Sequence, residues 1–392
     1  MLKAFITYTD EIDDAGLALA DIQAQMGSYY PEEGATLGIL SCHEEFVHTG
    51  VAESVVKAMP FPVVGMTSMC VGAGPVPAGD TNRAEGELRL TMMVISGDEL
   101  RFELIGSGPV SEDTDVQELA QRMLSGRGTP ALLLAFTPDY STVSCDALCQ
   151  AVSRALPGVP MFGGVGVDNS PLYNEDCYVI TPDGPKKGEL VMVTIYGAAT
   201  PEFFTASVPA DKVMGQAWRI TDSDKACLRM VDGNPVTEFL KSFGLTRSLA
   251  EDGALSGLSL IVKEPGKSPY SRTMLALDKH GDLACGGWMP GGSEIRMARF
   301  EKNAMLSAAM ALLESALNGP RRPTALVVWC CATRAAVLGD DNLAEIRLLR
   351  EFAGDIPFMF AYAGGEICPG LGDDGNLYNQ FHNQSFTLCA VY

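Results

Sequence analysis

One pattern occurs three times along the chain, over residues 3–95, 101–195 and 295–391. Each copy is about 95 residues long and has the order strand, helix, strand, helix, strand, strand. In the middle of each copy an apolar run and a helical stretch precede a second apolar run. That second run opens with an apolar residue and a proline: Phe61-Pro62, Val159-Pro160 and Ile356-Pro357. Proline is tolerated at the first residue of a strand, where no ladder hydrogen bond is lost. The recurrence predicts one architecture shared by three segments.

The strand–helix–strand centre of each copy has the length of a right-handed crossover in a parallel sheet. We therefore predict an α/β fold with mixed β-sheets and covering helices. It comprises three pseudo-repeats of β-α-β-α-β-β in two closely packed domains. Residues 1–200 are expected to hold two pseudo-repeats, and residues 201–392 an inserted segment (201–294) and the third. The first strand of that third copy is expected at Glu294–Phe300.

Turn residues predict hairpins that close the first two copies. One hairpin is expected at Ser96-Gly97-Asp98, with strands Glu87–Ile95 and Glu99–Ile105 on either side. The other is expected at Pro182-Asp183-Gly184-Pro185, a sequence rich in turn-forming residues.

The charge balance restricts the kinds of partner. The 392 residues include 28 basic and 49 acidic side chains, a net charge of −21, which disfavours nucleic acid and anionic membranes as partners. No stretch approaches the roughly 18 apolar residues of a membrane span, and the N-terminal apolar run is too short for a secretion signal. Eleven cysteines without a CxxC pair favour buried free thiols over a metal site. We therefore expect a cytoplasmic protein without membrane insertion.

The loops after the strands are the expected location of a ligand site, because open α/β sheets bind ligands beyond the carboxyl ends of their strands. After the second strand of each copy we expect polar or glycine-rich loops that point into a common hollow. Their candidate ligand-binding residues are Thr67, Ser68, Gly163, Gly164, Asp168, Asn169, Gly365 and Glu366. Gly163-Gly164 is interpreted as a turn. Arg334, after the first strand of the third copy, and Asn383, before its last strand, complete the set.

Several motifs together resemble the FIST family. The C-terminal FIST domain is resembled by Cys331–Arg334, Leu338-Gly339, Glu345, Ala361–Pro369, His382–Ser385, Val231–Val236 and Gly287–Ser293. The N-terminal FIST domain is resembled by Val159–Gly164. The resemblance implies a sensory, ligand-binding module of signal transduction, proposed to bind small molecules such as amino acids. No kinase, receiver or chemoreceptor segment is recognised in the sequence. We therefore expect signalling through a partner such as a histidine kinase or a chemoreceptor, and no enzymatic activity.

Two of the candidate charges have competing interpretations. The Arg334 guanidinium could fork onto a ligand carboxylate, or form an ion pair with Glu345 or Asp340. Glu366 could hold a ligand ammonium, or accept backbone N–H groups and fix its own loop.

The uncharged candidates and the loop acid also have structural alternatives. Asp168 and Asn169 follow a glycine pair, where turn formation is the usual role of such residues. Asn383 is interpreted mainly as a structural hydrogen-bonding residue. Thr67 and Ser68 are candidate pocket hydroxyls, although loops commonly contain such residues.

Two alternative functions stay open. Some stand-alone FIST proteins are described as haem-dependent nitric oxide sensors. Haem needs only one axial ligand, for which His382 and His43 are the candidates among four histidines. The other alternative is a thiol-dependent enzyme in which Cys331 lies beside Arg334 with Glu366 nearby, because a neighbouring cation can lower the pKa of a thiol.

Overall fold

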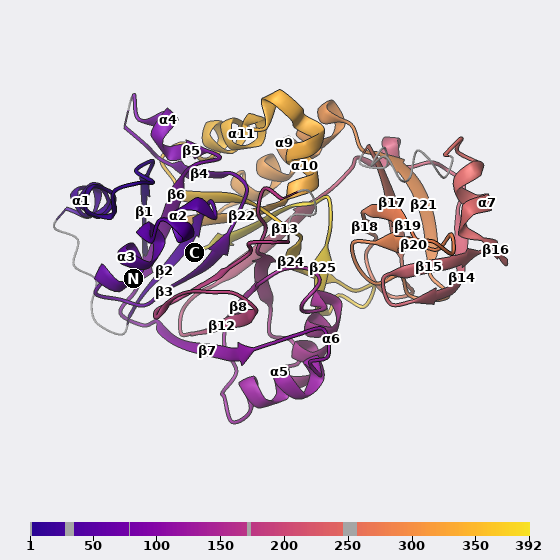
Figure 1. Cartoon of the computed structure of the whole chain (residues 1–392), viewed down its shortest axis with the longest axis horizontal. Helices are drawn as coiled ribbons and strands as arrows, with labels where there is room; N and C mark the ends of the chain where they lie inside the picture. Colours follow the sequence, from indigo (N-terminus) through magenta and orange to yellow (C-terminus); the bar gives the residue numbers. More distant parts are fainter. Residues whose placement is uncertain (1, 28–34, 78, 171–173, 246–256) are drawn as a thin grey trace.

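The structure is a computed structural model that describes residues 2–27, 35–77, 79–170, 174–245 and 257–392. It confirms a mixed α/β fold in two domains, a body built from the three repeats and a barrel-like domain at one end of it (Figure 1). None of the described helices is both long enough and apolar enough to cross a membrane.

The first repeat is a mixed sheet covered by helices on one face. Its strands lie in the order β1 (Lys3–Thr9), β6 (Leu90–Ser96), β2 (Thr36–Cys42) and β3 (Val63–Thr67). Strands β2 and β3 run parallel, and the other pairs are antiparallel. The covering helices are α1 (Ala15–Met26), α2 (Glu45–His48) and α3 (Val51–Ala58), whereas α4 (Thr81–Ala84) buries Ala84 in a different apolar cluster. Helix α1 begins where the Asp14 carboxylate accepts the Gly16 and Leu17 N–H groups, an N-cap.

The second repeat has the same order of strands. They are β7 (Arg101–Pro109), β12 (Glu189–Tyr196), β8 (Leu132–Thr137) and β9 (Met161–Val165), and the helices are α5 (Val116–Leu124) and α6 (Cys145–Ala155). The hairpin expected at Ser96–Asp98 is wrong, because β6 and β7 belong to different sheets. Turn residues there connect two repeats, and a turn signal does not distinguish such a link from a hairpin. A hairpin does form at Pro182-Asp183, between β10 (Val179–Thr181) and β11 (Gly184–Lys186).

The third repeat begins earlier in the chain than expected. Its strands are β13 (Pro201–Ala206), β26 (Phe386–Val391), β22 (Ala325–Cys331) and β23 (Phe358–Ala363), and its helices are α9 (Lys302–Leu317), α10 (Ala332–Leu338) and α11 (Ala344–Ala353). The expected first strand, Glu294–Phe300, is wrong. It forms β21 (Glu294–Arg299), which pairs inside the barrel domain. Buried Ile295 and Met297 alternate with more exposed neighbours there, as in any half-buried strand, so the pattern alone does not name the sheet.

Each repeat completes the sheet of another repeat. After its second parallel strand the chain leaves its own sheet and pairs next to the equivalent strand elsewhere. Strand β4 (Val71–Gly74) of the first repeat pairs with β23, β10 of the second pairs with β3, and β24 (Glu366–Leu371) of the third pairs with β9. Each arm carries one further strand, namely β5 (Glu85–Gly86), β11 or β25 (Leu377–His382). The three repeats therefore exchange arms in a closed cycle.

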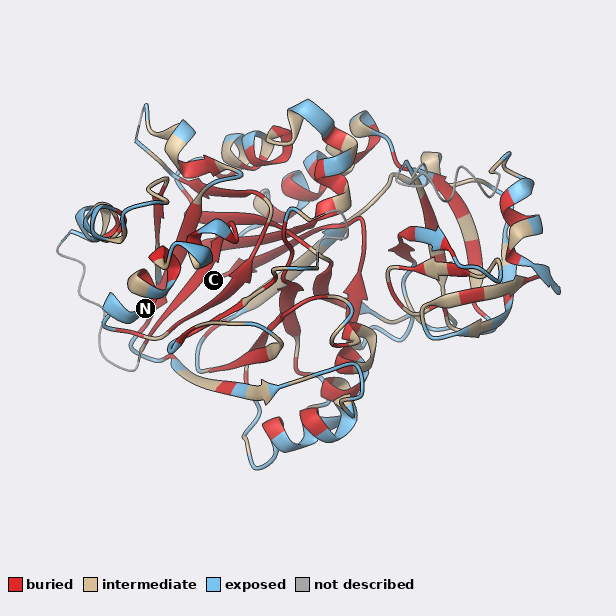
Figure 2. Cartoon of the chain, viewed as in Figure 1, coloured by how far each residue is buried: buried red, intermediate tan, exposed pale blue. Residues whose placement is uncertain are grey.

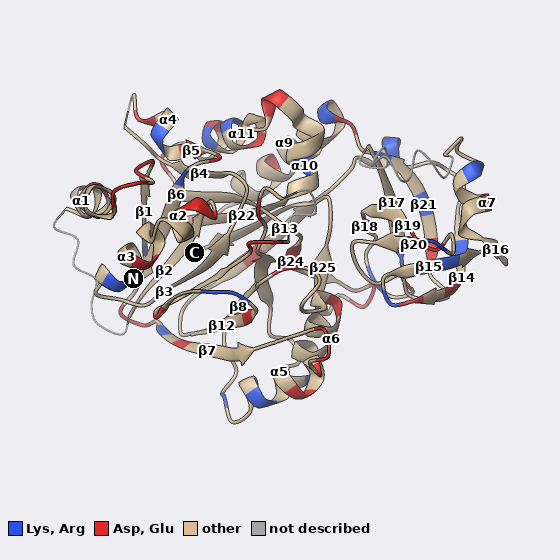
Figure 3. Ribbon diagram, in the orientation of Figure 1, with Lys and Arg blue, Asp and Glu red and all other residues tan. Residues whose placement is uncertain are grey.

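The exchange surrounds one shared core. All three sheets turn an apolar face toward it, with Ile39, Leu134 and Val327 among the buried contributors (Figure 2). On the outer faces the helices cover three separate apolar clusters. Acidic and basic residues lie mainly on the helices, loops and barrel strands, away from the central strands (Figure 3).

The barrel domain is inserted between β13 and α9. Its strands are β14 (Trp218–Asp224), β15 (Cys227–Val231), β16 (Asn234–Pro235), β17 (Leu258–Lys263), β18 (Tyr270–Arg272), β19 (Met274–Leu277), β20 (Leu283–Cys285) and β21, with helix α7 (Val236–Lys241). Strands β18 and β19 lie at opposite ends of the hydrogen-bonded order, yet only Thr273 separates them in the chain. The sheet must therefore curl around its own apolar core.

Candidate functional site

The loops that follow the second parallel strands do meet, but backbone fills their junction. The Gly364 N–H donates to the Val165 carbonyl over 2.8 Å, and the Val165 N–H donates to the Gly365 carbonyl over 3.1 Å. The Val167 N–H donates to the Thr67 carbonyl over 3.2 Å. The sequence therefore brings the predicted loops together, and the junction between them is a packed one.

The glycines predicted to line the site permit close packing of strands. Gly163 and Gly164 lie inside β9, so the turn expected there is wrong. A Cβ atom on Gly163 would stand 1.8 Å from the Ala135 carbonyl oxygen, and one on Gly164 would stand 2.5 Å from the Met66 methyl carbon. Gly365 has a φ of +142°, and a Cβ atom there would meet the Phe381 ring at 2.4 Å. Glycine commonly indicates a turn, but in a strand it also marks a close approach of backbones.

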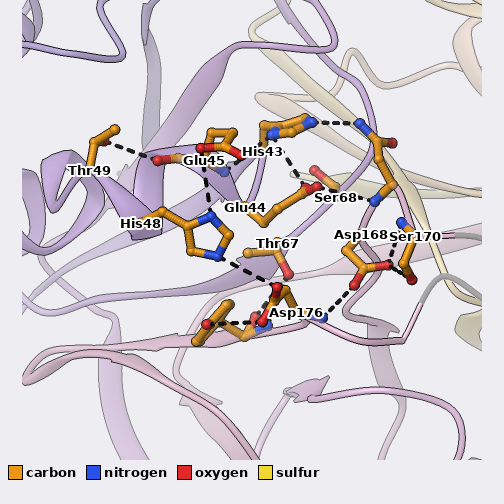
Figure 4. A network of polar contacts seen from close by, with 12 residues as sticks. His43, Glu44, Glu45, His48, Thr49, Thr67, Ser68, Asp168, Ser170 and Asp176 are labelled. Atoms are coloured by element: carbon orange, nitrogen blue, oxygen red, sulfur yellow. Dashed lines mark hydrogen bonds and ion pairs between the residues drawn. The ribbon is translucent and has the colours of Figure 1, made fainter.

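Thr67, Ser68 and Asp168 belong to a polar network between the first and second repeats (Figure 4). The Thr67 hydroxyl accepts the Tyr178 N–H over 3.0 Å, and the Ser68 and Ser41 hydroxyls are 2.7 Å apart. The Asp168 carboxylate accepts the Ser170 N–H over 3.0 Å and the Ser170 hydroxyl over 2.6 Å. These bonds satisfy local backbone, which is the turn-forming alternative for Asp168.

His43 lies in the same network (Figure 4), and Asn169 contacts it. His43 Nδ1 accepts the Glu45 N–H over 3.2 Å, and its Nε2 lies 2.5 Å from the side-chain amide nitrogen of Asn169. The Asn169 N–H donates to Glu44 over 3.2 Å. Both ring nitrogens of His43 thus have protein neighbours within hydrogen-bond distance.

Arg334 is engaged by protein groups on every side. It is fully buried at the start of α10, and its Nε donates to Glu345 Oε1 over 3.0 Å. Its Nη1 donates to the Gln384 carbonyl over 3.0 Å, and the Tyr362 hydroxyl donates to Glu345 Oε2 over 3.1 Å. Burial lowers the pKa of Arg334, but the charge of Glu345 and the hydrogen bonds to it outweigh burial, so the pKa is raised. In the structure Arg334 forms the ion pair with Glu345, which was one of the two interpretations of this residue.

Glu366 and Cys331 are buried next to this ion pair. Glu366 has no exposed surface, and neither of its oxygens has a hydrogen-bond partner, although the Ser385 N–H and the Cys331 thiol lie near. Burial raises the pKa of Glu366 well above its ordinary value. Burial also raises the pKa of Cys331 to about 12, so its sulfur is a protonated thiol at neutral pH. All eleven cysteines are free.

A cleft of about 870 Å³ lies between the third repeat and the barrel domain. We call it the β25 cleft. Its floor includes alternate residues of β25, and its other walls come from β13 and from the barrel strands β17, β18 and β21. The lining includes Phe203, Thr205, Ser207, Lys263, Ser271, Glu294, Arg296, Tyr378, Gln380, His382 and Ser385. Volumes of this size are typical of small-molecule sites.

Only part of this lining was predicted. His382 was a candidate solely as a haem ligand, and Gln380 and Tyr378 were missed. The signal for them is the strand period of two, which places Tyr378, Gln380 and His382 on one face of β25. Asn383 follows them, and its side-chain amide donates to the His382 carbonyl over 3.0 Å, as a structural residue would.

Arg272 joins the barrel domain to the body at the edge of this cleft. The side chain is fully buried on β18, its Nη2 donates to Asp146 on α6 over 2.7 Å, and its Nη1 donates to the Phe381 carbonyl on β25 over 2.9 Å. Asp146 also accepts the Trp288 N–H over 2.8 Å. We call these contacts the Arg272 latch. A second cleft, of about 730 Å³, lies on the other side of the latch and is lined by Asp146, Ala226 and Phe381 among others.

Among the residues that the structure describes, no group of three or more His, Cys, Asp or Glu side chains could hold a metal ion.

Comparison with known families gives two matches. The model of the FIST N domain matches residues 36–234, and that of the FIST C domain matches residues 237–369. No curated protein matches the chain.

Likenesses to solved structures are weak. A cyanuric acid hydrolase, described as an evolutionary innovation by structural concatenation, is 10% identical with a TM-score of 0.29, covering 76% of this chain and 100% of that one. A phosphoribosylformylglycinamidine synthase II from Thermotoga maritima is 8% identical with a TM-score of 0.19, covering 100% of this chain and 72% of that one. At such scores neither likeness informs the function of this chain.

Proposed function

Because the chain belongs to the FIST family, whose domains are generally small-molecule sensory domains of signalling proteins, we propose that it is a cytosolic sensor. It binds a small metabolite, such as an amino acid, in the β25 cleft and signals through a separate partner. The observation that supports this proposal is the position of the cleft between the third repeat and the barrel domain, directly beside the Arg272 latch.

The latch offers a route from ligand to signal. Strand β18 contributes Ser271 to the cleft and Arg272 to the latch, and β25 contributes His382 to the cleft and the Phe381 carbonyl to the latch. A ligand that binds Ser271 or His382 contacts residues that are next to Arg272 and Phe381 in the sequence. Arg272 and Phe381 form part of the latch. Differential binding to two positions of the barrel domain would shift their populations. The new position would present a different surface to a partner such as a histidine kinase or a chemoreceptor.

The test is a thermal-shift screen with a metabolite library, because a ligand of the native state raises the melting temperature. Ala206→Trp adds a large ring to the wall of the β25 cleft, and Ala226→Trp is the matched control in the second cleft. We expect at least one compound to stabilise the wild type and the Ala226→Trp variant, but not the Ala206→Trp variant. A library without a stabilising compound, or a shift that Ala206→Trp leaves intact, would contradict the proposal.

Haem is the second candidate, through the two histidines. His382 Nε2 lies 3.0 Å from the Cys368 carbonyl, and both ring nitrogens of His43 have protein neighbours. Polar side chains such as Ser271 and Glu294 line the same cleft as His382. These residues fit the apolar faces of a haem poorly, which favours the metabolite. A Soret band after haem titration that disappears in His382→Ala would reverse this preference.

We assign binding and no catalysis to this chain. The thiol alternative needs a reactive Cys331, whereas burial raises the pKa of that thiol to about 12. Iodoacetamide labelling of the folded protein followed by peptide mapping is the check. Slow labelling of Cys331 is expected, and alkylation faster than that of a free thiol in solution would favour the enzyme instead.

A further inference from the structure

The side chains of Glu366 and His382 project from the same face of the β24–β25 hairpin. They are directly opposite each other in the antiparallel register, as are Cys368 and Gln380. Side chains of directly opposite residues stand side by side on one face. That face also carries Gln380 and His382 into the β25 cleft. Glu366 is therefore next to His382 but, being fully buried, lies behind the residues that line the cleft at the end where His382 stands.

The groups at this inner end are acceptors. A carbonyl oxygen only accepts, so the 3.0 Å contact of His382 Nε2 with the Cys368 carbonyl places the ring proton on Nε2. Nδ1 then carries the lone pair, and no described residue donates to it. Burial lowers the pKa of His382 to about 4, so the ring is neutral at pH 7. The two oxygens of Glu366 have no hydrogen bond of good geometry, and only the Ser385 N–H and the Cys331 thiol lie near as donors. Buried acceptors without donors are costly.

We propose that the inner end of the β25 cleft, between the Glu366 carboxyl group and His382 Nδ1, is a subsite for a positively charged nitrogen of the ligand. The inference rests on the proposed function and names the chemical class of the ligand, a small amine. An ammonium group supplies three donors, which match Glu366, His382 Nδ1 and the amide oxygen of Gln380. A carboxylate or phosphate in the same place would meet the lone pair of His382 Nδ1 and could not form an ion pair with Glu366, so we expect an anion to bind there more weakly than an ammonium.

Binding at this subsite releases a proton. Burial raises the pKa of Glu366, so the empty subsite holds the neutral acid. The charged or titratable groups around it are Arg334 on α10, Glu345 on α11, Cys330 and Cys331 on β22, Cys368 on β24 and His382 on β25. Arg334 and Glu345 neutralise each other in their ion pair. An incoming ammonium favours the carboxylate form, and the carboxyl proton leaves to solvent as the ion pair with the ligand forms.

The experiment uses three probes of matched length: butylamine, butyrate and 4-aminobutyrate. Isothermal titration calorimetry at pH 7, in two buffers with different ionisation enthalpies, gives both affinity and proton release. We expect the two amines to bind and butyrate not to bind, with release of up to one proton. Glu366→Gln should weaken amine binding by about tenfold or more and abolish proton release. Glu314→Gln, at an exposed site on α9, is the matched control and should change neither.

Gln380→Ala provides a second variant that leaves the buried acid in place. It should weaken amine binding severalfold and keep the proton release. Butyrate binding as tightly as butylamine, proton release that survives Glu366→Gln, or no binding by any probe would overturn the subsite. If a library compound without a cationic nitrogen binds the cleft and is blocked by Ala206→Trp, the proposed function stands and only the subsite fails.

Discussion

His382 gives the free energy of unfolding a pH dependence that one substitution can remove. Its pKa is about 4 in the folded protein because burial disfavours the charged ring, against about 6.5 in an unfolded chain. Between these values the unfolded chain binds a proton that the folded protein does not. Stability is therefore full above pH 6.5 and falls as the pH drops toward 4.

His382→Gln removes this titration. Urea unfolding should show that the wild type loses ~2 kcal/mol more than the variant between pH 7 and pH 5. Glu366 acts in the opposite direction, because a raised carboxyl pKa lowers stability as the pH rises, but both proteins retain it. An equal loss in the two proteins would show that the ring is not buried in its neutral form.

Arg334 is the residue whose removal we expect to cost most. Arg334→Met leaves Glu345 buried without a counter-charge, and breaking a buried pair in this way costs about 3–5 kcal/mol. Arg347→Met is the control, because its pair with Asp341 is exposed and should contribute no more than about 1 kcal/mol. Chemical unfolding of both variants measures the difference. Similar losses would contradict a structural role for the Arg334–Glu345 pair.

At the scale of elements, two of the three parallel strand pairs depend on a glycine at the same place, whereas the pair of β22 with β23 has none in its paired residues. Gly65 in β3 and Gly163 in β9 are equivalent: a Cβ atom would stand 1.7 Å from the Leu40 carbonyl oxygen or 1.8 Å from that of Ala135. Gly163→Ala must push β8 and β9 apart, so we expect a loss of about 3 kcal/mol or more in thermal or urea unfolding. Gly106→Ala in β7 meets nothing within 4 Å and should be nearly neutral. Equal effects would contradict the close approach.

The same elements show what the sequence can and cannot predict. The βαβ centres were predictable because long apolar runs and helical periods act locally. The exchange of β4, β10 and β24 was not, because a short buried strand has the same pattern beside any partner. The site is similar: Glu366 and His382 were candidates by position, but their neighbourhood depends on the register of β24 with β25. Arg334 follows a strand, as predicted. Its ion pair with Glu345 depends on how the folded chain packs, which the sequence does not show.

On the scale of the whole molecule, the Arg272 latch holds the barrel domain against the body. Arg272→Met leaves Asp146 largely buried without its partner and removes the bond to the Phe381 carbonyl. We expect faster hydrogen exchange at the start of α6, in β18 and in β25, while the central strands stay protected. Arg229→Met, which removes exposed barrel pairs, is the control and should leave these amides unchanged. Unchanged exchange in Arg272→Met would mean that other contacts hold the domains.

The cyclic exchange of arms means that the chain cannot be cut into thirds. A fragment ending after the second repeat would leave β9 with an open edge, because its neighbour β24 has yet to be synthesised. The first repeat likewise donates β4 to a strand that lies far ahead in the chain. On the ribosome the early segments must therefore wait, with unpaired edges shielded, until the last hundred or so residues emerge and close the ring.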